Sequence, residues 1–232
     1  EQIGSLLIFD EVITGFRVLP GGAQEYFGVK ADVGTYGKVV GGGMPIGVIA
    51  GRKAYMDALD GGHWQYGDSS VPEVGVTYFA GTFVRHPFAL AAAKASLIHM
   101  KEMGSALQEG LNESTAWLAN EVNTFCDAAN IPFHLVHFGS LFKPKYDVDL
   151  ANHDLIYILL RYKGIHVYDG FPCFLTEAHT REDIEQIARS FKEAILELVE
   201  NGFLPGSSSG IKVNGVALPF GMVFDANKPP VP

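Results

Sequence analysis

The sequence feature that most constrains the fold is an apolar run at residues 6–9, Leu-Leu-Ile-Phe, which ends in Asp10 and Glu11. Consecutive apolar residues without alternation are typical of a strand buried on both faces, as in parallel sheets covered by helices. In open α/β sheets, ligands bind beyond the carboxyl ends of the strands. The run therefore predicts an α/β fold with an acidic group at the edge where ligands bind.

The chain opens on Glu1 rather than Met, only a few residues before this run. A native protein rarely begins inside its central sheet. We therefore expect further sequence upstream of Glu1, and this upstream sequence would hold part of any active site.

The composition indicates a globular protein, since 47% of the 232 residues are hydrophobic and 19% are charged. A net charge of −9 argues against nucleic acid as the main partner, because phosphate binding needs clustered Lys and Arg. Cys126 and Cys173 are too few for a disulfide framework and lack metal-ligand spacing. Neither a membrane span nor a secretory signal is visible. We expect a cytoplasmic protein without a metal site or a membrane partner.

Helices and strands alternate along the rest of the chain. Thr180, with Asp183 three positions later, predicts a capped helix that ends near Gly202. Residues 20–37 are rich in turn signals, and residues 60–76 read as a long surface loop. Further strands are expected at residues 46–50, 131–138, 141–146 and 165–168, and further helices at residues 87–103, 107–129 and 149–162.

Three features of the sequence could carry chemistry. Asp10 could face a cofactor, hold magnesium as in a nucleotide-hydrolysing enzyme, or simply end a strand. Lys38 lies between Gly37 and a Gly triplet, where the backbone can approach a ligand closely. A desolvated amine there would attack carbonyl groups. The alternative is an ordinary surface lysine, as most lysines are. Thr82 precedes a helix and could bind phosphate or cap that helix.

Together these features resemble a known family. Residues 10–17, Asp-Glu-Val-Ile-Thr-Gly-Phe-Arg, resemble a segment of the class III pyridoxal-phosphate aminotransferases. Residues 37–47 resemble that family's Schiff-base lysine motif, and residues 80–83 resemble its cross-subunit phosphate segment. The resemblance extends from about residue 5 to residue 202. It is strongest to glutamate-1-semialdehyde aminotransferase-like domains, in particular those of cyanobacterial hybrid polyketide–nonribosomal peptide synthetases such as the microcystin and nodularin toxin assembly lines.

The resemblance implies a fragment of the α/β fold called pyridoxal-phosphate-dependent transferase fold type I. Residues 1–105 would form the C-terminal part of the cofactor-binding large domain, and residues 106–203 the small C-terminal α/β domain. Residues 204–232 hold five of the twelve prolines, a composition that predicts an interdomain linker or an extended segment that lies on a neighbour.

The resemblance also implies a role for each matching residue. Asp10 would pair with the protonated pyridine nitrogen of pyridoxal 5'-phosphate, and Val12 would pack on one face of the ring. Lys38 would bind the cofactor aldehyde and then act as the catalytic base. Gly81 and Thr82 would reach the phosphate of the neighbouring subunit's cofactor, which requires a homodimer.

The expected reaction is transamination from an amino-acid donor to a keto substrate. Residues 168–175 are aromatic and contain no arginine, which favours a β-ketoacyl thioester on an acyl carrier protein over a small dianion. The alternative is a small-molecule substrate, as in the glutamate-1-semialdehyde 2,1-aminomutase of tetrapyrrole biosynthesis. Two remote alternatives are a nucleotide-hydrolysing domain, whose Gly-Lys-Ser/Thr loop the chain lacks, and a non-catalytic docking module.

Overall fold

The computed structural model describes residues 4–206 except 63, 74, 76, 78–80 and 151, together with residues 212–213 and 216–217. The chain divides into two compact units. Unit 1 comprises Glu1–Ala116, Phe138–Leu141 and Leu175–Glu177, and unit 2 comprises Trp117–His137, Phe142–Phe174 and Ala178–Pro232.

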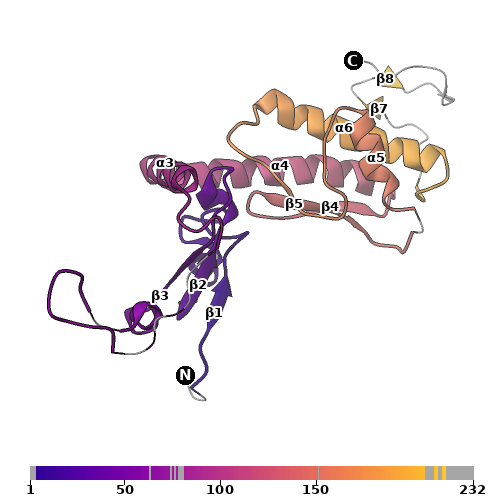
Figure 1. Ribbon diagram of the computed structural model, residues 1–232. Helices are drawn as coiled ribbons and strands as arrows, with labels where there is room; N and C mark the ends of the chain where they lie inside the picture. The colour runs from indigo at the N-terminus through magenta and orange to yellow at the C-terminus, as the bar shows by residue number, and fades with distance from the viewer. Residues whose placement is uncertain are drawn as a thin grey trace. The chain divides into compact units, whose positions relative to one another are not determined.

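A three-stranded sheet in the order β1-β2-β3 forms the centre of unit 1 (Figure 1). Its strands are β1 (Ile8–Asp10), β2 (Val33–Tyr36) and β3 (Val48–Gly51). β1 and β2 are parallel, with Asp10 opposite Thr35, whereas β2 and β3 are antiparallel. Because parallel strands end at the same edge of a sheet, the segments that follow Asp10 and Tyr36 leave it side by side.

Residues 20–37 contain two elements that their turn signals concealed, namely α1 (Gly22–Phe27) and β2. The short helix α1 is held by a distant side chain, since the buried carboxylate of Glu11 accepts hydrogen bonds from the backbone N–H groups of Ala23 and Gln24. This contact is tertiary, so the local sequence pattern could not reveal it.

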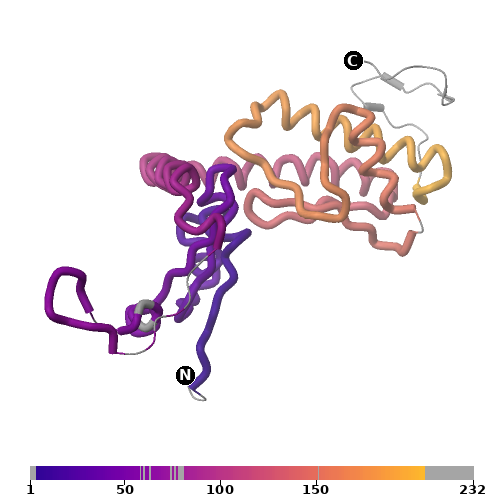
Figure 2. The backbone as a smooth tube through the Cα atoms, viewed as in Figure 1, coloured from indigo at the N-terminus to yellow at the C-terminus, as the bar shows by residue number. Residues whose placement is uncertain are grey.

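Two longer helices follow a loop. After α2 (Lys53–Met56) and the 3-10 helix η2 (Asp57–Asp60), the described residues between 61 and 77 contain no helix or strand, as expected; Figure 2 traces them as an open loop. α3 (Pro87–Met103) has the predicted bounds, with Pro87 in its first turn, where the missing N–H costs little. α4 (Ala106–Ala128) lies one residue from its prediction at each end.

The expectation that residues 6–9 are buried on both faces was wrong. The side chains of Leu6, Leu7 and Ile8 are 43%, 44% and 57% exposed. Among the described residues β1 is an edge strand paired only with β2, so nothing covers its outer side. The apolar run therefore forms an exposed edge in this chain.

Unit 2 is built on a second sheet in the order β4-β5-β6, and β4 (Phe133–Phe138) and β5 (Leu141–Tyr146) closely match their predictions. The helices are α5 (Leu155–Tyr162), which is shorter than expected, and α6 (Arg181–Glu200). The core includes the rings of Phe133 and Phe142, both of which pack against Phe191 of α6 at 6.4 Å between centroids.

The predicted cap of α6 is present. Thr180 accepts a hydrogen bond from the Asp183 backbone N–H, and the Asp183 side chain accepts one from the Thr180 backbone N–H. The apolar positions that recur at helical spacing along α6 are buried and form its inner face: Ile184, Ile187, Ala188, Phe191, Ile195 and Leu198.

The strand expected at residues 165–168 is absent, because this described segment has no ladder partner. Instead Arg161 donates a hydrogen bond to the carbonyl of Val167 and forms an ion pair with Asp169. Side-chain contacts therefore hold this segment in place of the backbone hydrogen bonds of a sheet. The third strand is the short β6 (Cys173–Phe174).

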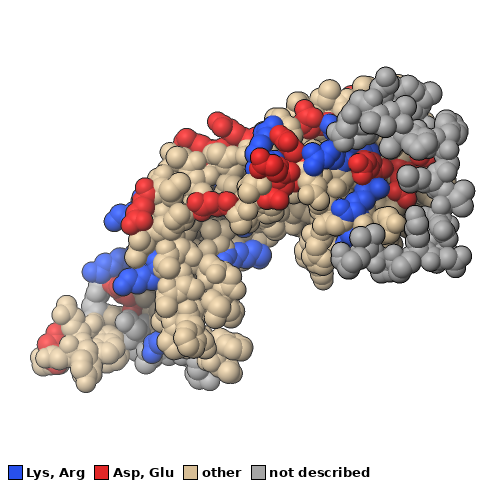
Figure 3. Space-filling model, turned by 90° about the horizontal axis from the view of Figure 1, so that it is seen from above, with Lys and Arg blue, Asp and Glu red and all other residues tan. Residues whose placement is uncertain are grey.

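In the region assigned to the linker, the structure describes only residues 204–206 and the antiparallel pair β7 (Lys212–Val213) and β8 (Val216–Ala217); the rest lies outside the described residues. Among the described helices, none is long and apolar enough to cross a membrane. On the face shown in Figure 3, acidic and basic side chains intermingle.

Candidate cofactor and catalytic site

Asp10 is the last residue of β1, and its carboxylate is fixed at the edge of the sheet. One carboxylate oxygen accepts hydrogen bonds from the Val12 backbone N–H at 3.0 Å and from the Thr35 hydroxyl at 3.3 Å. The residue is exposed, so the carboxylate remains able to accept a further hydrogen bond. Asp10 is therefore an oriented acceptor beyond the end of a strand.

Glu11 faces the opposite way, because successive side chains of an extended segment alternate. Only 1% of Glu11 is exposed, and its carboxylate accepts from the N–H groups of Ala23 at 3.1 Å and Gln24 at 2.8 Å and from the Thr14 hydroxyl. Glu11 thus anchors the segment that carries Asp10 and Val12.

Lys38 follows Gly37 directly after β2 and opens the 3-10 helix η1 (Lys38–Gly41). Its φ of 41° is in the left-handed region, which costs a non-glycine residue roughly 1–2 kcal/mol. Such strain persists only where the surrounding structure fixes the backbone. The turn is tightly packed here, because a Cβ at Gly37 would lie 3.2 Å from the Ile46 carbonyl oxygen and 3.5 Å from Val12 Cγ1. Val12 therefore lies beside the turn that presents the exposed Lys38.

The glycine triplet brings this turn against α3. Gly42 and Gly43 have φ values of 56° and 91°, which glycine adopts without strain. A Cβ at Gly42 would overlap the Ser96 hydroxyl, so close packing as well as backbone conformation requires glycine there. The glycine triplet thus fixes the path of the backbone after Lys38.

Tyr36 supports the Lys38 turn from within the sheet. Its ring lies 5.8 Å from that of Phe16, and its hydroxyl accepts a hydrogen bond from Gln24 Nε2 at 3.2 Å. A Cβ on Gly15 would come within 2.8 Å of the Tyr36 ring. Tyr36 was not among the residues predicted to form the site.

Two amide side chains of α4 hold the segment that follows the acidic pair. Gln108 donates to the carbonyl of Phe16 at 3.0 Å, and Asn112 donates to that of Val18 at 2.8 Å. Residues four apart share one helix face, so both donors reach the same stretch of backbone. Phe16 itself has a φ of 59°, which these contacts help to maintain. No sequence pattern pointed to either amide.

Gly81 and Thr82 lie in a turn ahead of α3, where the Val84 N–H donates to the Gly81 carbonyl at 3.1 Å. His86, and not Thr82, occupies the N-cap position of α3. The alternative that Thr82 caps this helix is therefore wrong. Thr82 is exposed, and no side-chain hydrogen bond within the described part of the chain joins it to Asp10, Val12 or Lys38.

In the described part of the chain, neither the two cysteines nor His134 forms a second reactive centre. Burial raises the pKa of the Cys126 thiol to about 12 and that of the Cys173 thiol to about 11, so both stay protonated near neutral pH. His134 bonds to Asp127 and Asp147 and ties together elements of unit 2. In the described ranges no group of three His, Cys, Asp or Glu side chains could hold a metal ion.

Residues 1–169 match the family model described as Aminotransferase class-III, and the chain belongs to this family. The glutamate-1-semialdehyde 2,1-aminomutase of Alkaliphilus oremlandii (strain OhILAs) is 34% identical over 210 residues, covering 85% of this chain and 46% of that protein. The protein of the same name from Ruminiclostridium cellulolyticum is 35% identical over 211 residues, with the same two coverages. The chain thus spans about half the length of these relatives.

Solved structures agree with this assignment. A β-phenylalanine aminotransferase from Variovorax paradoxus matches 89% of this chain and 47% of its own, with 28% identity and a TM-score of 0.70. An omega-transaminase from Sphaerobacter thermophilus matches 84% of this chain and 44% of its own, with 25% identity and a TM-score of 0.70. The expected α/β architecture of a fold type I transferase fragment is confirmed. Residues 6–11 lie within the part of the chain that matches the class III aminotransferase family, which argues against a nucleotide-hydrolysing domain.

Proposed function

We propose that this chain forms part of a pyridoxal-phosphate-dependent aminotransferase in which Lys38 carries catalysis. The observation that carries the proposal is the parallel pairing of β1 and β2, which brings the fixed Asp10 carboxylate and the Lys38 turn to one edge of the sheet. Val12 lies beside that turn and offers an apolar surface. A carboxylate, a primary amine and a small apolar side chain suit a cationic ring that bears an aldehyde, so the residues fit the cofactor.

When bound, pyridoxal phosphate supplies an electron-withdrawing ring that stabilises the negative charge left on the substrate Cα after proton loss. Asp10 would hold the proton on the ring nitrogen, because a carboxylate nearby favours the charged form. The Lys38 amine would bind the cofactor aldehyde, be displaced by the substrate amine, and then carry the proton away from Cα. Val12 would pack on one face of the ring and keep water from it.

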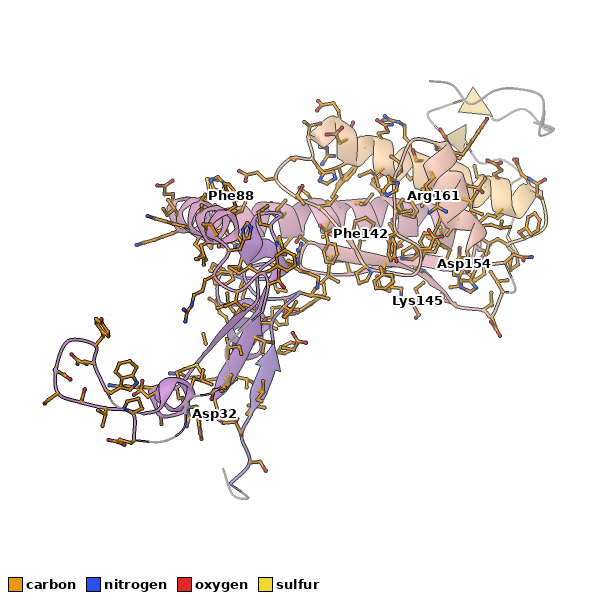
Figure 4. All side chains as sticks on the ribbon, viewed as in Figure 1. Asp32, Phe88, Phe142, Lys145, Asp154 and Arg161 are labelled. Atoms are coloured by element: carbon orange, nitrogen blue, oxygen red, sulfur yellow. The ribbon has the colours of Figure 1, made fainter. Side chains whose placement is uncertain are left out.

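A homodimer is part of the proposal, with Gly81 and Thr82 reaching the phosphate of the other subunit's cofactor. The exposed hydroxyl of Thr82 supports this assignment. The neighbouring segment and α3 expose large apolar side chains, with Phe83 67%, Phe88 70% and Leu90 50% exposed; Figure 4 labels Phe88 on α3. Apolar surface of this kind is typical of a protein interface.

The carbonyl substrate has two candidates, each with an amino-acid donor. The relatives named glutamate-1-semialdehyde 2,1-aminomutase favour a small aldehyde that carries a carboxylate. The apolar walls of a cavity beside Lys38 favour a β-ketoacyl thioester, as in a cytoplasmic hybrid polyketide–peptide synthetase. The first candidate has the stronger support from similarity, and the second depends on the cavity.

Substitution of the lysine in the full-length protein tests the proposed reaction. Lys38→Ala should lower the rate of amino transfer at least a thousand-fold, because it removes both the cofactor attachment and the base. Lys30→Ala is the matched control, since Lys30 is an exposed lysine of the same unit. Equal rates for the two variants would reject the assignment of Lys38.

A further inference from the structure

A cavity of about 500 Å³ lies within unit 1, and Lys38 forms part of its wall. Sites for small molecules commonly enclose about 300–1,000 Å³, with apolar walls and a few polar groups. In the proposed reaction Lys38 takes a proton from the Cα atom of the amino donor, so the donor must lie within reach of the Lys38 amine. The cavity therefore offers a space in which an amino donor can meet Lys38.

Three polar side chains of the wall belong to one part of it: Arg17, Gln108 and Ser140. Gln108 Nε2 donates at 3.0 Å to the carbonyl of Phe16, which precedes Arg17 in the chain. On the other side of Arg17, a Cβ at Gly139 would lie 3.2 Å from the Cα of Val18. Gln108 and the residue before Ser140 therefore flank the segment that carries Arg17, and we call these three side chains the polar corner.

Arg17 supplies positive charge to the polar corner. Its Nε donates to the Ile13 carbonyl at 3.0 Å, and a guanidinium carries five N–H donors in all. Burial lowers the pKa of Arg17, so its surroundings disfavour the charged form, and a bound anion would offset that penalty. A carboxylate matches the guanidinium well, because the two groups can form two parallel hydrogen bonds.

The other two members of the polar corner carry buried oxygen atoms that lack a hydrogen-bond partner within the described part of the chain. These atoms are Gln108 Oε1 and Ser140 Oγ, and only 2% and 1% of the two residues are exposed. A buried polar group without a partner is costly. A ligand that accepts from the Ser140 hydroxyl and donates to Gln108 Oε1 would remove both penalties.

An α-amino acid has this combination of groups. Its carboxylate and its amino group are attached to the same carbon, so one small molecule can accept from Arg17 and Ser140 and donate to Gln108. The wall also holds negative charge, since the carboxylate of Glu177 lies 2.8 Å from His99 Nε2. A zwitterion suits such a wall because it adds no net charge.

The remainder of the wall is mainly apolar and includes six large side chains: Phe16, Val39, Met100, Leu107, Leu111 and Leu175. The side chain of a bound amino acid would lie against this surface. With the polar corner occupied, a second carboxylate would meet apolar carbon atoms or the carboxylate of Glu177, which is costly. An apolar side chain would instead remove its own surface from water.

We propose that Arg17, Gln108 and Ser140 bind the carboxylate and the amino group of the amino donor, and that this donor is an α-amino acid with an apolar side chain. The inference rests on the proposed function and adds to it the class of donor and the residues that select it. In ping-pong transamination the spent donor leaves before the keto substrate enters, so one cavity can serve both in turn.

Isothermal titration calorimetry on the cofactor-free full-length protein tests the polar corner without any activity. L-Norleucine has the two head groups and an apolar side chain. Pentylamine is the same molecule without the carboxylate, and L-glutamate adds a second carboxylate. We expect the Kd of norleucine to be at least ten-fold lower than that of either pentylamine or glutamate.

Two variants assign the effect to the polar corner. Arg17→Gln should raise the Kd of norleucine at least ten-fold, whereas Arg52→Gln should leave it unchanged, because Arg52 pairs with Asp32 at 3.0 Å outside the cavity. Ser140→Ala should raise this Kd about five-fold but should not lower the midpoint of thermal unfolding of the ligand-free protein, since it removes a hydroxyl without a partner. If Arg17→Gln does not fold, Ser140→Ala decides.

Kinetics with pyridoxal phosphate bound give a second readout. Arg17→Gln should raise KM for norleucine at least ten-fold and leave kcat/KM for pentylamine unchanged, because pentylamine has no carboxylate to lose. An equal loss for both donors would indicate a structural defect and would reject the role of Arg17.

Equal affinity for norleucine and pentylamine, tighter binding of glutamate, or no binding of norleucine would overturn the inference and leave the cofactor assignment intact. Failure of Lys38 to bind the cofactor would instead reject the proposed function, and the calorimetry would still decide whether the polar corner binds an amino acid.

Discussion

Glu11 is expected to hold the cofactor end of β1 in place, and Glu11→Gln tests this role. The wild-type carboxylate accepts two backbone hydrogen bonds, from Ala23 at 3.1 Å and Gln24 at 2.8 Å, and a third from the Thr14 hydroxyl. Glutamine keeps one acceptor oxygen but replaces the other with a donor NH₂ group. At least one buried N–H group therefore loses its acceptor, although the side chain keeps its size.

The magnitude follows from the number and kind of bonds. A hydrogen bond to a charged group contributes about 1.5–3 kcal/mol, and the remaining bonds weaken when the charge is lost. We expect Glu11→Gln to lower the free energy of unfolding by about 3 kcal/mol. For a chain of this size, 1 kcal/mol corresponds to about 2–4 °C, so the midpoint of thermal unfolding should fall by about 6–12 °C.

Thermal unfolding followed by circular dichroism measures the effect. Glu25→Gln is the matched control, because Glu25 also accepts a backbone hydrogen bond at the start of α1, from Gly21 at 2.6 Å, but is exposed. The control should change the midpoint by less than about 4 °C, since exposed bonds contribute about 1 kcal/mol or less. If Glu11→Gln shifts the midpoint no more than the control, the anchoring role is wrong.

Three further variants probe other parts of the structure. Thr180→Ala should destabilise unit 2 by about 1 kcal/mol in urea unfolding. Hydrogen bonds from the Thr180 backbone N–H and hydroxyl lower the pKa of Asp183, so the stability they give is present above the usual aspartate pKa and lost as pH falls through the lowered value. The variant keeps the backbone N–H and loses the hydroxyl, so the acid side of its stability curve should be shallower but still present. Cys126→Ala should flatten the alkaline side of the stability curve. Burial raises the pKa of the Cys126 thiol to about 12, so the associated stability is present below the unfolded thiol pKa and is lost as pH rises towards 12. Gln108→Leu removes the donor to Phe16 and should cost about 1 kcal/mol and weaken pyridoxal phosphate binding in a fluorescence titration.

Elements specified by local signals could be predicted from the sequence. α3 begins at Pro87 with its predicted bounds, and α6 has the cap that Thr180 and Asp183 indicated. These signals lie within a few residues of the feature they determine, so a sequence pattern carries them fully.

Features that depend on distant contacts could not be predicted. α1 depends on Glu11, and the segment at residues 165–168 bonds to the side chain of Arg161 instead of forming a strand. The exposure of residues 6–8 follows from which strands pair with β1, which no local pattern determines. In the same way Asp10 and Lys38 were recognised as motif residues, whereas Tyr36, Gln108 and Asn112 support the site through long-range contacts alone.

The central claim is that Lys38 is the amine that binds the cofactor aldehyde, and chemical trapping tests it most directly. The full-length protein is incubated with pyridoxal phosphate, reduced with borohydride, digested and mapped by mass spectrometry. We predict one reduced cofactor group per chain, on the peptide that contains Lys38, and unmodified peptide at the exposed Lys30. A label at another lysine, or one spread over several lysines, would contradict the account.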